Sequence, residues 1–172
     1  MATELSYKPV NGPVIGQDIN VSKSTQMHDL GTLLRDKFGR EFMYVIANGA
    51  VTGQGYTCAV DSSYDATLLT TAIANTLSRF MGPCATNGAP EDDDYMWLCM
   101  SKPPGDTEMG IWTAASAAAD AQLYTTSTAG QLATATANAP IDNVRLLTAT
   151  GGSAAVNTAS EWHYMARGLA GT

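Results

Sequence analysis

Two apolar runs in the middle of the chain have the composition of β-strands. They are Tyr95–Met100 and Gly110–Ala115, and a Pro-Pro-Gly sequence lies between them. A shorter run follows at Leu123–Thr126, after a crossing of small residues. Tyr, Trp, Leu, Ile and Thr favour a pleated, half-buried surface, whereas Pro and Gly favour turns. This part of the chain therefore predicts a β-meander.

Further strand patterns flank the meander on both sides. The clearest is Glu41–Ala47, EFMYVIA, which ends at an Asn-Gly turn sequence. Tyr56–Val60 and Ile141–Thr150 also have apolar or alternating character. Ahead of these runs, the polar cluster at 36–39 predicts a hairpin turn.

Three segments have a less distinct pattern. Ala66–Met81 carries apolar residues at helical spacing, namely Leu69, Ile73, Leu77 and Phe80. Its many Thr residues favour extended chain, which we expect here in preference to a helix. Gln131–Pro140 is predicted to be an Ala/Thr-rich connection. Ser160–Thr172 is apolar but has no further partner run, so it either closes a barrel or docks elsewhere.

Together the patterns predict an all-β fold, mainly antiparallel, as a barrel or sandwich with at most one short helix. Residues 1–27 have few clustered apolar side chains and several Pro and Gly breaks, which predicts an extended N-terminal arm, either ordered against a neighbour or frayed. Residues 28–172 are predicted to form a single β-rich domain, because a chain of this length is one domain by prior. The expected core contains at least one cysteine together with Phe42, Tyr44, Val45, Trp97, Leu98, Leu123 and Leu146.

Composition narrows the range of partners. Charged residues make up 15% of the chain, the formal net charge is −7, and the basic residues are scattered. Because binding to phosphates needs clustered Lys and Arg, we expect no nucleic-acid partner. We also expect no membrane partner and synthesis in the cytoplasm, since no long apolar stretch or secretory signal is visible. The abundant small, neutral residues suit contacts between subunits.

The three cysteines are Cys58, Cys84 and Cys99, an odd number in a chain long enough to fold without disulfides. All three lie within or beside apolar runs. They are therefore predicted to be free, buried thiols that behave as small hydrophobic side chains.

Residues that could carry chemistry do not form a convincing set. The acidic run Glu91–Asp94 lacks the spacing of a calcium loop and is predicted to be solvated. Ser153 sits in a sequence that partly mimics a nucleophile elbow, but no helix is predicted after it. His28 and His163 are the only histidines, and neither belongs to an H-x-x-x-H pair. We therefore predict no enzyme, no catalytic residue, no cofactor and no metal.

The order of the strand motifs resembles that of a known family. The motifs are Leu-Gly-Thr at 30–32, Gly-x-x-Phe-x-Tyr-Val at 39–45, aromatic-x-Trp at 95–97, an Ala-rich crossing with an Asp, and Leu-Tyr followed by Gly-x-Leu at 123–132. Over most of 28–150 this pattern is similar to the head decoration (cement) proteins of tailed bacteriophages. The resemblance implies a protein on the outer capsid surface of the virion that binds the major capsid protein and neighbouring cement subunits.

The resemblance also implies a homotrimer, and composition predicts that its contacts are apolar, built from small residues and little weakened by salt. Two alternatives remain open. One is a glycan-binding module of a phage tail or fibre, in which Trp97, Trp112 and Trp162 would form an aromatic platform, although an apolar strand favours burial of Trp97. The other is a tail-tube or neck protein.

Overall fold

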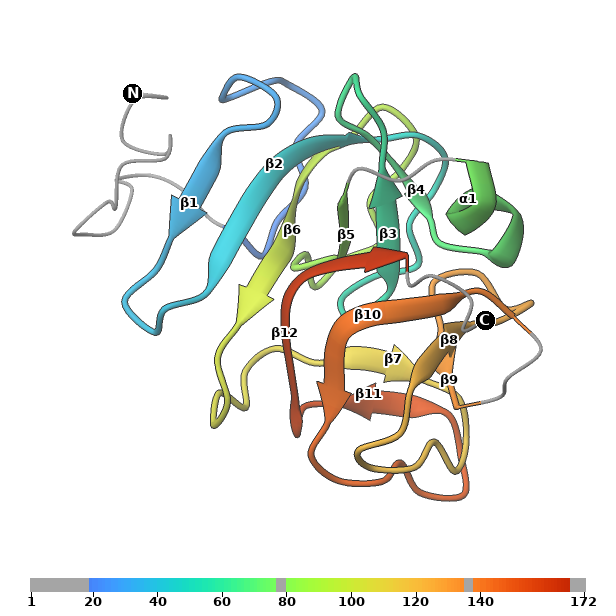
Figure 1. Cartoon of the computed structure of the whole chain (residues 1–172). Coiled ribbons are helices and arrows are strands. Elements are labelled where there is room, and N and C mark those ends of the chain that lie inside the picture. The colour runs from blue at the N-terminus through green and yellow to red at the C-terminus, as the bar shows by residue number, and fades with distance from the viewer. Residues whose placement is uncertain (1–18, 77–79, 135–137, 168–172) are drawn as a thin grey trace.

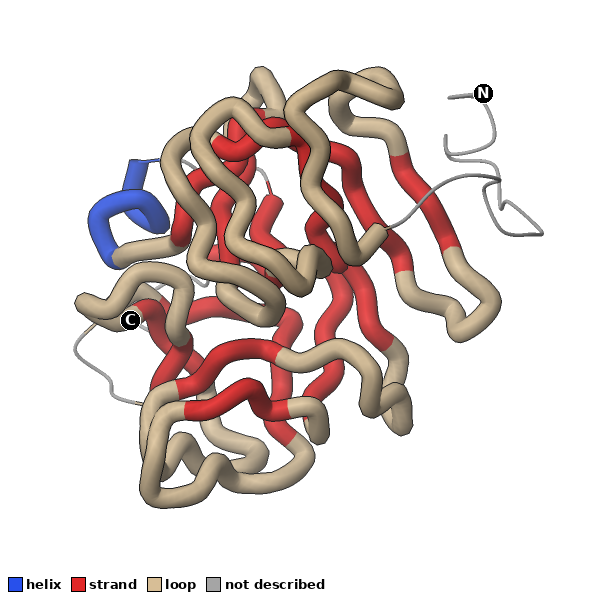
Figure 2. Tube along the Cα trace, turned by 180° about the vertical axis from the view of Figure 1, so that it is seen from behind, coloured by secondary structure: helices blue, strands red, loops and turns tan. Residues whose placement is uncertain are grey.

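The fold is almost entirely β, as the sequence predicts (Figure 1; Figure 2). A computed structural model describes residues 19–76, 80–134 and 138–167. The elements are β1 (Leu33–Arg35), β2 (Glu41–Ala47), β3 (Thr57–Val60), β4 (Asp65–Leu68), α1 (Thr71–Thr76), β5 (Phe80–Pro83), β6 (Tyr95–Lys102), β7 (Ile111–Thr113), β8 (Leu123–Thr125), β9 (Leu132–Ala133), β10 (Pro140–Leu146), β11 (Ala155–Asn157) and β12 (Ser160–Arg167). Most pairs are antiparallel, and the pairs β2–β4 and β7–β9 are parallel. No helix in the described part of the chain is long and apolar enough to cross a membrane.

Six strands close into a barrel. β2 pairs with β4, β4 with β3, β3 with β5, β5 with β12, β12 with β6, and β6 with β2, so the path of pairing returns to its start. Closure pairs the edges of these strands with one another. Alternate side chains of the strands fill the interior, among them Met43, Val45, Cys58, Val60, Met96, Leu98 and Met100.

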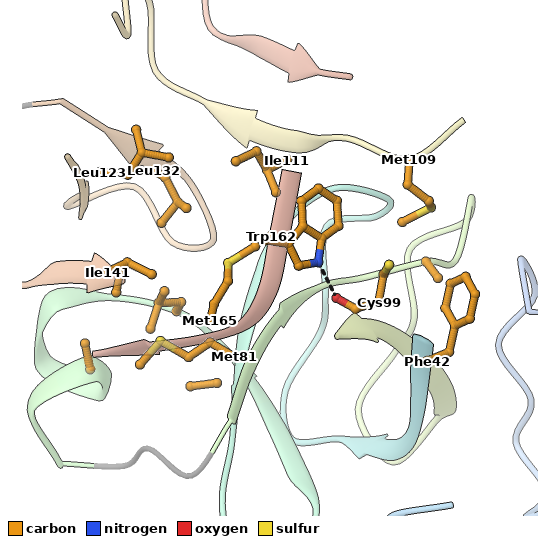
Figure 3. Packing of buried hydrophobic residues seen from close by; sticks show 14 of the residues in the cluster. Phe42, Met81, Cys99, Met109, Ile111, Leu123, Leu132, Ile141, Trp162 and Met165 are labelled. Carbon is orange, nitrogen blue, oxygen red and sulfur yellow. Dashed lines mark hydrogen bonds between the residues drawn. The ribbon is translucent and has the colours of Figure 1, made fainter. Parts of the chain in front are cut away.

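A second sheet packs against the outside of this barrel. It continues from β12 through β10, β8, β9 and β7 to β11 (Figure 1). The cluster between barrel and sheet includes Trp162, whose indole Nε1 donates a hydrogen bond of 2.9 Å to the Cys99 carbonyl (Figure 3). Because core lies on both sides of β2, both its inward Met43 and its outward Phe42 are buried, which explains its nearly continuous apolar run. Every residue predicted for the core is buried, and so are all three cysteines.

The segment Ala66–Met81 is neither all extended nor all helical. β4 and β5 occupy its two ends, as extended chain predicts, but α1 lies between them. The helix begins after Thr70, whose Oγ1 accepts a hydrogen bond of 3.2 Å from the Ile73 amide, as an N-cap residue does. Residues 77–79 lie outside the described part of the chain.

Of the two alternatives predicted for Ser160–Thr172, closure of the barrel is confirmed, and residues 168–172 lie outside the described residues. Ser160–Arg167 is a long strand, β12, that pairs with β10, β5 and β6 and belongs to both the barrel and the second sheet. The alternative of docking elsewhere is therefore wrong. Two short strands, β9 and β11, were also not predicted, and β9 lies within the expected connection at Gln131–Pro140.

The described part of the predicted arm runs along the barrel. Lys23 exchanges backbone hydrogen bonds of 2.8 and 2.9 Å with Tyr95 of β6, and Ile19 packs against the core. The Met27 amide donates a hydrogen bond of 3.0 Å to the hydroxyl of Tyr44. Residues 1–18, the rest of the predicted arm, lie outside the described residues.

Candidate docking surface

The acidic run at Glu91–Asp94 fastens a loop to other parts of the fold. Asp92 Oδ1 accepts a hydrogen bond of 2.6 Å from the Gly49 amide, and Asp94 Oδ2 accepts one of 3.0 Å from Ser22 Oγ. Within the described ranges, no group of three or more His, Cys, Asp or Glu side chains is arranged to hold a metal ion. The contacts of this run are those of a structural loop.

The other residues considered for chemistry lie in separate parts of the fold. Ser153 is in an exposed loop that leads into β11, not into a helix. His163 Nδ1 lies 3.0 Å from Ser101 Oγ, as a pair across the neighbouring strands β12 and β6. His28 packs edge-on against the Tyr44 ring at 5.2 Å, and burial lowers its pKa. The structure does not bring the two histidines and Ser153 together.

The cysteines are free and buried, as predicted. Burial raises the pKa of Cys84 to about 11 and that of Cys58 and Cys99 in the same direction, because a thiolate is poorly solvated in an apolar core. Neutral thiols at these sites act as packing groups.

The three tryptophans do not share a surface. Trp97 and Trp162 are buried in the core, and only Trp112 is partly exposed, with its ring stacked on Tyr56 at 4.9 Å. A three-ring sugar platform is therefore not present, and the burial predicted for Trp97 is confirmed.

The surface with the clearest features of a contact site is at the tip of the β1–β2 hairpin. Phe38 lies at this tip and is 48% exposed, one of three large hydrophobic side chains in the described residues that are exposed, with Val21 and Met27. Asp36 fixes the turn because its Oδ1 accepts hydrogen bonds from the Phe38 amide at 2.9 Å and the Arg40 amide at 3.0 Å. An exposed aromatic ring on a fixed turn is a typical element of a binding surface.

Arg40 connects this turn to the loop between β6 and β7. Its side chain is only 8% exposed and lies 2.6 Å from Asp36 Oδ2, 3.0 Å from Glu108 Oε2 and 3.6 Å from Asp106 Oδ2. Burial disfavours the guanidinium charge, but the hydrogen bond to Asp36 and the three carboxylates outweigh it, so the pKa of Arg40 is raised. We call the joined segments 36–40 and 103–108 the hairpin end.

Two hollows flank Pro103 and Pro104 at the hairpin end. One, of about 340 Å³, lies between these prolines, Phe38 and Glu108. The other, of about 600 Å³, continues along β12 and β10 and is lined by Ser101, Pro103, Pro104, Asn143, Val144, Arg145, Glu161 and His163. Pro103 and Pro104 thus form an apolar ridge that borders both hollows and is surrounded by polar residues. An apolar centre with a polar rim is typical of a protein contact surface.

Two irregular backbone positions lie at or next to the lining of the larger hollow. Asn143 and Tyr164 have φ values of 61° and 48°, and the register of β10 with β12 shifts at Asn143. A tyrosine in the left-handed region is unusual, and here its hydroxyl is held by a hydrogen bond of 3.0 Å to Glu41. The resulting bulge bends β12, which pairs there with β10 of the second sheet and with β5 and β6 of the barrel.

The sequence pattern predicted the hairpin turn but did not mark it as a candidate contact surface. Phe38 and Arg40 were not singled out, because the partners that give them significance, Asp106 and Glu108, lie far along the chain. The only local signal is a large apolar residue at a polar turn.

Compared with family models, with curated proteins and with solved structures, the chain matches none.

Proposed function

We propose that this chain is a capsid decoration protein, which binds the outer surface of a phage head through its hairpin end and stabilises the mature lattice. The observation that carries the proposal is the exposed Phe38 ring, on a turn that Asp36 fixes, beside Pro103 and Pro104. A side chain that is held in position before binding loses little conformational entropy when a partner buries it.

The packing of the motif residues agrees with this proposal. Tyr44 and Trp97 belong to two of the motifs that carry the resemblance to decoration proteins, and His28 lies next to a third, Leu-Gly-Thr at 30–32. Their rings contact one another, with centroids 5.2 Å apart for His28 and Tyr44 and 4.9 Å for Tyr44 and Trp97. Motifs that are distant in sequence thus pack within one structural unit.

The stabilising effect would follow from mass action. A protein that binds the assembled lattice, and not its dissociated subunits, shifts the equilibrium toward the lattice. Each contact with the major capsid protein can be modest, because many copies act together on one head. The resemblance implies that the copies bind as trimers beside neighbouring cement subunits.

Copy number in purified virions of the encoding phage tests the proposal. A decoration protein is expected in numbers comparable to those of the major capsid protein. The two alternatives, a glycan-binding module of a tail or fibre and a tail-tube or neck protein, predict few copies. A low copy number would therefore overturn the proposal.

A second experiment tests the surface. Recombinant protein is added to heads that lack it, and binding is measured by co-sedimentation. Phe38→Ser should weaken binding at least roughly tenfold, the effect of losing one central aromatic contact. Met27→Ser is the matched control, because Met27 is also an exposed large hydrophobic residue but lies outside the hairpin end. Equal binding by the two variants would remove Phe38 from the contact.

A further inference from the structure

The outward side of the second sheet carries aromatic residues. Trp112 of β7 and Tyr124 of β8 each lie between two fully buried sequence neighbours. Successive side chains of a strand point to opposite faces, so both rings point away from the core. In a sheet with one face in water, such outward positions are ordinarily polar.

Neighbouring strands extend this apolar row. Val156 of β11 is the cross-strand partner of Trp112, and Pro140 of β10 is a partner of Tyr124. The ring of Tyr56 stacks on Trp112 with an interplanar angle of 13°. We call this surface the aromatic face, and it consists of five partly exposed residues: Tyr56, Trp112, Tyr124, Pro140 and Val156.

The aromatic face is also free of charge. The strands β7, β8, β9 and β11 contain no charged residue, and between Met109 and Ile141 the only charged residue is Asp120. The net charge of −7 must therefore lie on other parts of the chain. Two copies that met through those parts would bring like charges together, which opposes association. The aromatic face avoids this cost, and depletion of charge with enrichment of Tyr and Trp is typical of the centre of a protein contact.

We propose that the aromatic face is the contact between copies of this chain and that its occupant is a second copy. The inference names the surface through which neighbouring subunits of the proposed decoration protein contact one another. It rests on the proposed function only for the number of copies that meet. Burial of Trp112 and Tyr124 drives the contact, so the association should be insensitive to salt.

An isosteric charge change tests the proposal. Gln131 is partly exposed and directly precedes β9, the strand between β8 and β7, and Gln131→Glu adds a charge there without changing size. Asn87→Asp is the matched control, because it makes the same amide-to-carboxylate change at an exposed residue outside the face. Circular dichroism and thermal melts check that all variants are folded.

Sedimentation velocity at micromolar to submillimolar protein provides the readout. Wild type and Asn87→Asp should sediment at a multiple of the 18.0 kDa chain mass at low and high salt. Gln131→Glu should raise the dissociation constant at least roughly tenfold at low salt, with partial recovery at high salt because screening weakens the added repulsion. Trp112→Ala should weaken association at any salt concentration.

The outcomes separate this proposal from the proposed function. A wild type that stays monomeric, or a Gln131→Glu variant that associates like wild type, would overturn the aromatic face as the contact between copies. Phe38→Ser should still self-associate while losing binding to phage heads. Loss of self-association in Phe38→Ser, with none in Gln131→Glu, would move the contact to the hairpin end.

Discussion

Replacing Arg40 by Met tests whether the hairpin end is held by its buried ion cluster. Met keeps much of the length and apolar volume of the side chain but removes the guanidinium. Asp106, whose side chain is 7% exposed, and Asp36 would then lose their nearest cation. A buried carboxylate without a partner is strongly destabilising, because it has lost its hydration without compensation.

The structure allows the size of the effect to be estimated. Breaking a buried ion pair costs about 3 to 5 kcal/mol, whereas a pair with an exposed partner such as Glu108 contributes about 0 to 1 kcal/mol. Since Asp36 retains some access to water, we expect Arg40→Met to lower the free energy of unfolding by about 3 kcal/mol. With an unfolding entropy of about 2.1 cal/mol/K per residue over 172 residues, this corresponds to a fall in Tm of about 8 °C.

Arg35→Met is the control, because it makes the same change on the same hairpin. Arg35 is 55% exposed and lies 3.9 Å from Glu41, so its loss should cost less than about 0.5 kcal/mol. Urea unfolding of both variants measures the difference. The double variant Arg40→Met/Asp106→Asn should recover part of the loss, because it removes the unpaired charge. Equal stability of Arg40→Met and Arg35→Met would refute the argument.

Three further changes have expected outcomes. Gly31→Ala should cost about 1 to 3 kcal/mol more than Gly49→Ala in urea unfolding. Both glycines have positive φ, but a Cβ on Gly31 would lie 2.3 Å from the Tyr64 ring, whereas a Cβ on Gly49 would meet nothing within 4 Å. Equal costs would contradict this packing. The free energy of unfolding should fall as the pH rises from about 9 to 11, because the pKa of Cys84 is raised to about 11 in the folded state and the unfolded thiol ionises first. This thiol alone contributes roughly 2 to 3 kcal/mol to the fall. Urea unfolding at each pH measures the profile, and Cys84→Ala should flatten it. Lys102→Met should lower the free energy of unfolding by about 1 to 3 kcal/mol, because the buried Nζ donates hydrogen bonds of 2.6 and 2.5 Å to the carbonyls of Thr158 and Ser160. An unchanged Tm would show that these carbonyls find other donors.

The strands that the sequence predicts well are those whose character is local. Glu41–Ala47 matches β2 residue for residue, and Tyr95–Met100 lies within β6, because both runs combine β-favouring residues with clear turns at their ends. These two strands also pair with each other along most of their length. Their side chains, including Tyr44 and Trp97, were consequently identified as core residues.

The parts that the sequence left open depend on contacts between distant segments. β12 is recognisable only through its partners, which come from three separate places in the chain. Its bend at Tyr164 also disrupts the alternation that would mark a regular strand. In Ala66–Met81, Leu69 and Ile73 both pack on the core, but one precedes α1 and the other lies within it, so a single periodicity could not describe the segment.

The two proposed contacts differ in the physics that governs them. Phe38 at the hairpin end lies beside charged groups, with the Lys37 ammonium 4.9 Å from its ring centre and Glu108 across the smaller hollow. The aromatic face has no charged residue, and Figure 1 shows its strand β8 on the side of the molecule away from the β1–β2 turn. Salt screens exposed charges but leaves apolar burial almost unchanged. Salt should therefore change binding to the lattice, in a direction set by the charges that the lattice places against Lys37 and Glu108, while association between copies persists. Co-sedimentation with heads and sedimentation velocity of the free protein, each at low and high salt, measure the two effects separately.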